Sequence, residues 1–225
     1  MLLALDTATP RVTVALHDGS DVVAEHVAEQ GMRHGEQLAP AIEAVMREAG
    51  VVRQDLTAVA AGVGPGPFTG LRVGLVTART LGFVLDVPVY GVCSLDVLAV
   101  EAVATGAVAA GVSEAAGEAD QGFLVATDAR RKEVYVAAYA ADGTRADGPH
   151  VLRPADVADA AGRLVVGEGG ALYPDVFTRA TGPLRPSAGW LARVVAEELA
   201  ELLDPEPLYL RRPDAVAPGA RKPAS

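Results

Sequence analysis

The end of the first apolar run carries residue types suited to phosphate and metal chemistry. Asp6 follows that run directly, and Thr7 and Thr9 come next. A carboxylate and two hydroxyls at a strand end can bind a metal ion and a phosphate, and the same residue types also cap backbone turns. Asp6, Thr7 and Thr9 are therefore candidate contacts to a nucleotide or phosphate, with a purely structural turn as the alternative.

A second candidate is the loop of residues 62–70, which is rich in glycine and proline. It leads an apolar run into a predicted helix, where backbone N–H groups and the helix dipole can bind an anion. It is not a P-loop, because the Gly-Lys-Ser/Thr ending is absent and Pro65 and Pro67 lack N–H donors. A rigid strand-to-helix turn is the competing interpretation.

A third candidate is the basic cluster Arg130, Arg131 and Lys132. Arginine can bind phosphate or carboxylate through two parallel hydrogen bonds. The cluster is therefore suited to a phosphate or an acidic partner, with Arg130 as the candidate phosphate contact, and a solvated turn is the alternative.

The histidines and the single cysteine argue against hydrolytic chemistry. The four histidines form neither His-x-x-x-His nor His-Glu-x-x-His, the spacings typical of zinc hydrolases. Cys93 lies in an apolar run, where a small core residue is the favoured interpretation. A lone cysteine also excludes an intramolecular disulfide. We assign no catalytic residue and no metal ligand.

Small residues recur at a spacing of four: Gly70, Gly74, Ala78 and Gly82. They share one side of a helix predicted to start at an N-cap Thr69 and to end near Leu85. Three helical glycines cost about 2 to 3 kcal/mol relative to alanine, so close packing must compensate. The packing partner is either this chain's own layers or another subunit, and composition does not separate the two.

The elements that position these residues follow from the period of the apolar pattern. Three strands come first, and helices then alternate with strands. The predicted strands cover residues 2–6, 12–16, 22–27, 56–63 and 87–92, and the predicted helices cover 35–49, 69–85 and 95–110. This order is typical of the ribonuclease-H-like unit of actin, Hsp70 chaperones and sugar kinases, so the predicted fold class is α/β with that architecture.

The pattern restarts near residue 122, which suggests two related subdomains. Strands are predicted over 123–127, 133–140 and 163–167, with helices over 154–160 and 187–203. The predicted organisation is a first subdomain (1–110) carrying the partner-binding helices, a linker (111–121), a degenerate second subdomain (122–206), a segment returning to the first subdomain (207–212) and a disordered tail (213–225).

Charge and hydropathy limit the surroundings of the protein. The 225 residues carry a net charge of −10, which argues against independent binding of nucleic acid through the overall field. The N-terminus has no basic segment before its apolar residues, unlike a signal peptide. The longest apolar stretch is interrupted by Pro65, Pro67 and Arg72, so no membrane span is predicted. We expect a cytoplasmic protein.

Several motifs together resemble one family. They are Leu5–Thr9, Arg33–Pro40, Gly62–Gly74, Pro88–Leu95, Asp128–Arg130 with Glu133–Tyr135, and Pro207–Arg211. In this combination the chain resembles the TsaB (YeaZ) family over nearly its whole length. The most specific piece is Gly-Pro-Gly-Pro-Phe-Thr-Gly-Leu-Arg-Val-Gly, in which Pro67 stands where the family usually has serine.

The resemblance implies a non-catalytic subunit of the bacterial machinery that adds threonylcarbamoyl to the adenosine 3′ of the anticodon in tRNAs reading codons that begin with A. Such a subunit pairs with the related catalytic subunit TsaD, or with itself when alone, and the ATPase TsaE joins the assembly. ATP and metal belong to those partners, so no cofactor is expected on this chain. Contact with tRNA is expected only within the complex.

The family's interface is a bundle of the two helices that here follow His34 and Thr69. The implied interface residues are Leu38, Ile42, Val45, Gly70, Gly74, Ala78 and Gly82. The His-x-x-x-His metal pair of TsaD would fall at Ser94 and Leu98, which cannot replace two imidazoles. Two alternatives stay open at this point: an ATP-binding enzyme of the actin-like superfamily with Asp6 as its metal or base group, and an M22-type metallopeptidase.

Overall fold

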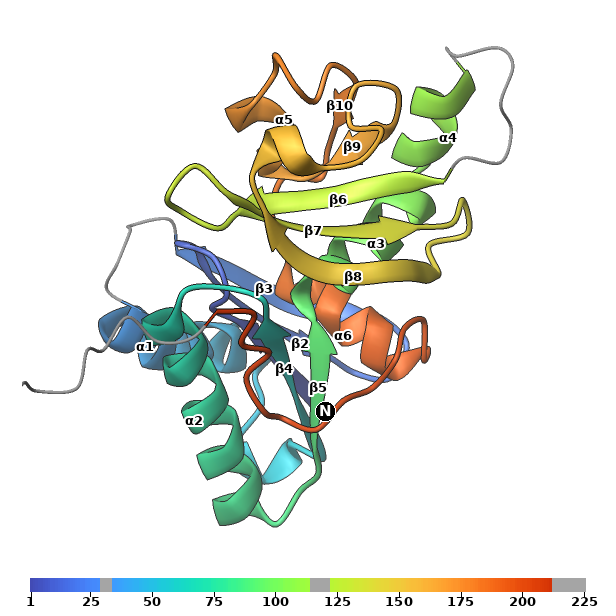
Figure 1. The fold of residues 1–225 in the computed structure, drawn as a ribbon. Coiled ribbons are helices and arrows are strands. Elements are labelled where there is room, and N and C mark those ends of the chain that lie inside the picture. Colours follow the sequence, from blue (N-terminus) through green and yellow to red (C-terminus); the bar gives the residue numbers. More distant parts are fainter. Residues whose placement is uncertain (29–33, 114–121, 212–225) are drawn as a thin grey trace, which may run out of the picture.

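Two five-stranded sheets form the framework of the chain, and the computed structural model describes residues 1–28, 34–113 and 122–211 (Figure 1). The strands of the first sheet are β1 (Leu2–Asp6), β2 (Val12–His17), β3 (Val22–Ala28), β4 (Ala58–Gly64) and β5 (Val89–Cys93). The strands of the second are β6 (Phe123–Asp128), β7 (Val134–Tyr139), β8 (Arg145–Leu152), β9 (Leu164–Val166) and β10 (Ala180–Thr181).

The two sheets have the same topology. Their orders are β3-β2-β1-β4-β5 and β10-β9-β6-β7-β8, which correspond strand by strand when the second is read backwards. In each, the first three strands pair antiparallel, and the fourth and fifth add in parallel beside the first. The predicted actin-like α/β fold with two related subdomains is therefore confirmed. We call the subdomains the first and second lobes.

Helices cover both faces of the first sheet. The helical elements of the chain are α1 (His34–Ala49), η1 (Arg53–Asp55), α2 (Phe68–Leu85), α3 (Ser94–Ala104), α4 (Ala107–Ser113), η2 (Pro154–Asp156), α5 (Glu168–Leu172) and α6 (Ala188–Ala196). Alternate residues of β1 point to opposite faces, as the strand period requires. Leu3 and Leu5 lie in one core cluster with residues of α1 and α2, whereas Ala4 lies in another with residues of α6.

The helix α3 joins the lobes. Leu95 and Leu98 pack in a core cluster with β6 and β7, and Val97 packs with α6 on the far face of the first sheet. Most of α3 is buried, which agrees with its largely apolar sequence, and Ser94 and Asp96 are buried with it.

Several predicted boundaries need correction. Pro67, and not Thr69, holds the N-cap position of α2. The predicted helix over 95–110 is divided into α3 and α4 at Gly106, whose φ of +77° is incompatible with a continuing helix. Residues 154–160 contain only the short turn η2, and the helix predicted over 187–203 ends at Ala196.

The predicted limits of the second subdomain are also wrong at their C-terminal end. Helix α6 falls within 122–206 but packs on β1 and β2 of the first lobe. Residues 207–211 run along the first lobe, where the N–H of Leu208 donates to the carbonyl of Val63. The predicted linker begins inside α4, and its remainder and the predicted tail over 213–225 lie outside the described residues.

Candidate functional site

Asp6, the first candidate, lies in the interior at the end of β1. Only 1% of it is exposed. One carboxylate oxygen accepts from the N–H of Ala8 at 2.7 Å, and the other accepts from the hydroxyl of Ser94 at 2.6 Å. Burial raises the pKa of Asp6, and the two hydrogen bonds oppose this shift. The carboxylate thus ties β1 to the start of α3.

The two threonines beside it also make internal contacts. The Thr7 hydroxyl donates to the carbonyl of Gly70 at 2.8 Å, and the Thr9 hydroxyl accepts from the N–H of Arg11 at 3.2 Å. The His34 ring lies 2.8 Å from the Thr9 carbonyl oxygen. Both threonines are buried. These contacts fit the structural-turn alternative for Asp6, Thr7 and Thr9, because their polar groups hold the loop together.

The glycine-rich loop closes the space in which an anion would bind. A Cβ added to Gly66 would overlap the Ala8 carbonyl oxygen, and one added to Gly62 would overlap a carboxylate oxygen of Asp6. The two loops thus touch through backbone atoms, with no gap for a phosphate between Gly66 and Ala8. The rigid strand-to-helix turn, and not the anion site, describes this loop.

The small residues of α2 face the protein's own sheet. Gly70, Gly74, Ala78 and Gly82 are all buried. A Cβ on Gly74 would overlap the hydroxyl of Thr7, and one on Gly82 would overlap a methyl group of Val89. The interface role predicted for this row is therefore corrected, since the row lets α2 approach β1 and β5. On α1, Leu38 and Val45 are likewise buried in the core and Ile42 is half-buried against it.

The opposite side of α2 exposes large apolar side chains. Phe83 is 89% exposed, Val84 70% and Val76 62%. Together with the exposed Thr80, these positions recur at spacings of three and four, so they share one side of the helix. Sequence reasoning missed this face, although the same spacing rule that found the glycine row could have found it.

Helix α1 lies beside α2 on the same face of the sheet (Figure 1). We define the α1–α2 face by the exposed residues Ala39, Pro40, Glu43, Val76, Phe83 and Val84. By length and composition α2 could cross a membrane, with a mean hydropathy of 1.3. Its glycine side is packed on the protein's own strands, however, so only the outer side is available to another molecule.

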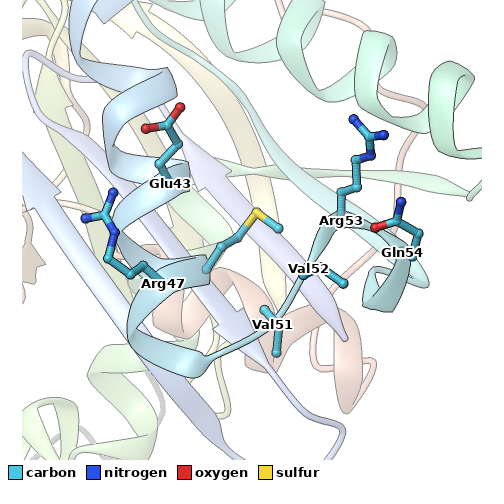
Figure 2. A pocket seen from close by; sticks show the side chains of 7 residues that line it. Glu43, Arg47, Val51, Val52, Arg53 and Gln54 are labelled. Atoms are coloured by element: carbon cyan, nitrogen blue, oxygen red, sulfur yellow. The ribbon is translucent and has the colours of Figure 1, made fainter.

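A groove follows the C-terminal end of α1 (Figure 2). It has a volume of about 530 Å³ and lies between α1 and η1. Figure 2 shows the guanidinium groups of Arg47 and Arg53 on opposite sides of the groove. They do not converge on one point, so the groove has no arrangement of side chains suited to catalysis.

A polar network between the lobes, buried at Asp96 and Tyr139 and exposed at Glu201, was also missed by sequence reasoning. Tyr139 donates to Asp96 at 2.7 Å, and Arg145 lies 3.7 Å from Asp96 and 3.1 Å from Glu201. Burial raises the pKa of Asp96, against the hydrogen bond from Tyr139 and the charge of Arg145. These residues come from four separate segments, and no spacing in the sequence links them. The network connects α3 and the segment after α6 to β7 and β8.

Arg130, the last predicted phosphate contact, is exposed at the turn between β6 and β7. It pairs with Asp128 at 3.2 Å. Cys93 is fully buried, and burial raises the pKa of its thiol to about 12, so its nucleophilic thiolate is suppressed. Within residues 1–28, 34–113 and 122–211, no three His, Cys, Asp or Glu side chains are grouped so that they could hold a metal ion.

Comparison with known proteins gives consistent matches. The family model described as "TsaD: tRNA N6-adenosine threonylcarbamoyltransferase" matches residues 21–166. An uncharacterized protein of Mycobacterium tuberculosis is 41% identical over 220 residues, covering 95% of this chain and 93% of that protein. The tRNA threonylcarbamoyladenosine biosynthesis protein TsaB of Escherichia coli is 30% identical over 232 residues, covering 93% of this chain and 94% of that protein.

A solved structure agrees with these sequence matches. It is the crystal structure of a Pseudomonas aeruginosa protein described as uncharacterized and similar to peptidase YeaZ. It superposes with a TM-score of 0.73 at 31% identity, covering 93% of this chain and 99% of that one.

Proposed function

Because this chain belongs to the TsaB (YeaZ) family of tRNA threonylcarbamoyladenosine biosynthesis proteins, we propose that it serves that pathway as a non-catalytic partner subunit. It binds a TsaD-like catalytic subunit through the α1–α2 face. The modified nucleoside is the adenosine 3′ of the anticodon in tRNAs that read codons beginning with A. The place of action is the cytoplasm, where tRNA is modified in bacteria.

The observation that carries this proposal is the outer side of α2. Phe83, Val84 and Val76 are large apolar side chains on one side of a helix whose other side is fixed to its own sheet. Contiguous apolar surface of this kind marks a site of association in soluble proteins. Aromatic residues are frequent binding hot spots, and Phe83 lies in the last turn of α2. The α1–α2 face therefore suits a second protein.

The interior around Asp6 supports the non-catalytic part of the proposal. In an ATP-using relative, the first-lobe loop would present its carboxylate and hydroxyls to metal and phosphate. Here Asp6 and Thr7 are each 1% exposed, and the backbone of Gly66 lies against Ala8. ATP and metal are therefore assigned to the catalytic subunit and to a TsaE-like ATPase that joins the assembly.

The test is association of the purified chain with its TsaD-like partner, measured by size-exclusion chromatography and by titration. The variant Phe83→Glu with Val84→Glu places two charges on the face. We expect at least about 30-fold weaker association, since a binding hot spot contributes 2 kcal/mol or more. The matched control is Leu172→Glu with Leu184→Glu, because these leucines are 51% and 53% exposed on the second lobe, at α5 and beside it.

Two results would contradict the proposal. One is unchanged association of the double variant, with a normal thermal transition to show that it is folded. The other is full tRNA threonylcarbamoylation by the remaining components when this chain is left out. Without the catalytic subunit, the same face is expected to form a homodimer, so the double variant should elute as a monomer.

A further inference from the structure

The turn between β6 and β7 has a backbone that its residues disfavour. Arg130, Arg131 and Lys132 have φ angles of 60°, 55° and 61°, so three successive residues are left-handed. For residues other than glycine this conformation costs about 1 to 2 kcal/mol each. Glycine would adopt it without that cost, yet the chain has long cationic side chains at all three positions. Strain of this kind points to a role for the side chains themselves.

The rest of the turn is held firmly. The N–H of Ala129 donates to Glu133 and the N–H of Glu133 donates to Arg130, both at 3.0 Å. Asp128 accepts from the N–H of Arg130 at 2.8 Å. From the C-terminal segment, Arg211 donates to the Ala129 carbonyl at 2.8 Å and pairs with Glu133. The turn therefore presents its cations from a fixed backbone, which lowers the entropy cost of binding.

The chemistry of the turn suits phosphate groups. All three side chains are exposed, and the ion pair of Arg130 with Asp128 is on the surface, where such a pair is weak and easily exchanged. Guanidinium groups match the geometry of phosphate oxygens. Because the whole chain carries a charge of −10, a polyanion would be attracted to this turn and not to the protein at large.

The turn is also linked to the N-terminal end of α2, one of the two helices of the α1–α2 face. The C-terminal segment runs along α2 and makes three successive contacts: Glu206 with Arg79, Tyr209 with Arg72, and Arg211 with Ala129 of the turn. The contacts thus lead from the middle of α2 toward its N-terminal end and on to the turn. Figure 1 shows the β6–β7 turn on the same side of the molecule as α1.

We infer that the β6–β7 turn contacts the phosphate backbone of tRNA when the catalytic subunit occupies the α1–α2 face. This inference rests on the proposed function and adds to it a direct RNA contact made by this chain. A catalytic subunit seated on that face would lie next to the turn, so one tRNA can touch both. The contact reads no base, because it is made through charge and phosphate geometry.

The experiment uses the complex of the full chain with its catalytic subunit and a fluorescently labelled, unmodified tRNA transcript. Affinity is measured between 50 and 200 mM salt. The test variant is Arg130→Gln with Lys132→Gln. The matched control is Arg53→Gln with Arg153→Gln, which removes the same charge from two exposed positions on other segments. Each lost phosphate contact reduces the slope of log affinity against log salt by about 1.

For the test variant we expect the slope of log affinity against log salt to be shallower by about 2. Between 50 and 200 mM salt, the loss of tRNA affinity should then be about tenfold smaller than in the unsubstituted complex. The control should keep the slope of the unsubstituted complex. Unchanged affinity and slope in the test variant would overturn the inference. So would loss of the catalytic subunit from that variant, because the turn would then be a protein-docking site. If the unsubstituted chain fails to bind the catalytic subunit before tRNA is added, the proposed function itself has failed.

Discussion

The two lobes share one strand topology and differ in what covers it. In the first lobe the connections before and after β4 are long helices, α1 with 16 residues and α2 with 18. The corresponding connections of the second lobe are η2 with 3 residues and α5 with 5. The last strands differ as well, with 5 residues in β5 and 2 in β10. The first lobe therefore has the long helices that carry an exposed apolar face, and the second lobe has only short helical turns in the corresponding places (Figure 1).

The two lobes also differ at the end of their first strands, β1 and β6. Asp6 ends β1 and Asp128 ends β6, and each accepts from the N–H two residues later. Asp6 is buried and hydrogen-bonded to Ser94, whereas Asp128 pairs with Arg130 at the surface. One loop has become part of the core and the other a charged turn. A shared backbone motif thus does not fix a shared role, because the second partner of each carboxylate decides it.

The largest effect is expected from changing how the first lobe's long helix packs. Gly74→Leu would force a side chain into the space of Thr7 and Leu5. We expect the free energy of unfolding to fall by about 3 kcal/mol, since the buried side chains of Thr7 and Leu5 cannot move aside fully for the added leucine. Urea unfolding of the isolated chain measures this.

The control for that variant is Thr80→Leu, on the exposed side of the same helix. It should change the stability by less than about 0.5 kcal/mol. A folded Gly74→Leu chain of normal stability that fails to bind its partner would contradict the packing described here. It would instead restore the interface role predicted from the sequence for the glycine row.

A smaller effect should separate the two equivalent aspartates. Asp6→Ala leaves the buried hydroxyl of Ser94 and the N–H of Ala8 without their acceptor, and we expect a loss of about 2 to 3 kcal/mol. Asp128→Ala removes a surface ion pair and a turn hydrogen bond, and should cost about 1 kcal/mol or less. Thermal unfolding of both variants gives the comparison, and equal losses would mean that the two loops have not diverged as described.

The sequence predicted the first lobe better than the second, for a physical reason. The hairpin of β2 and β3 and the helices α1 and α2 follow from local periodicity, because each has one clearly apolar face. Strand β8 contains Gly148 and Pro149, which read as a loop in isolation. The assignment of α6 to the first lobe depends on long-range contacts. One is the hydrogen bond that the N–H of Ala188 donates to the Thr13 hydroxyl, which joins residues 175 positions apart. No local pattern carries that information.

The candidate site shows the same limit in a sharper form. Spacing correctly grouped Gly70, Gly74 and Gly82 on one side of α2, but it does not tell in which direction that side points. The structure shows that this side of α2 points inward, because a Cβ added to Gly74 would meet Thr7 and one added to Gly82 would meet Val89 of the same chain. Small residues allow two backbones to approach, and large apolar residues make binding surface. We therefore propose the side with Val76 and Phe83 as the partner face.

The smallest effect concerns Glu101 on α3, the helix between the lobes. Burial raises its pKa to about 7, and the negative charge of Glu25 adds to this, while Arg11 opposes it. A carboxyl whose pKa is higher in the folded state than in the unfolded state stabilises the fold while it is protonated. That contribution is complete below its ordinary pKa of 4.5 and is lost as the pH rises to about 7.

The melting temperature should therefore decline from pH 5 to pH 7 more steeply in the unsubstituted chain than in Glu101→Gln, which has no proton to lose. The exposed Glu48→Gln on α1 removes the same charge and serves as the control for net charge. The expected difference is a small one in how steeply the melting temperature falls with pH. It is small because Glu101 is only half-buried and solvent screens its interactions. Because Glu25 lies on β3, the pH dependence of the melting temperature also measures the repulsion between β3 of the first lobe and α3. Parallel slopes in all three proteins would show that the lobes meet at α3 without the burial of charge described here.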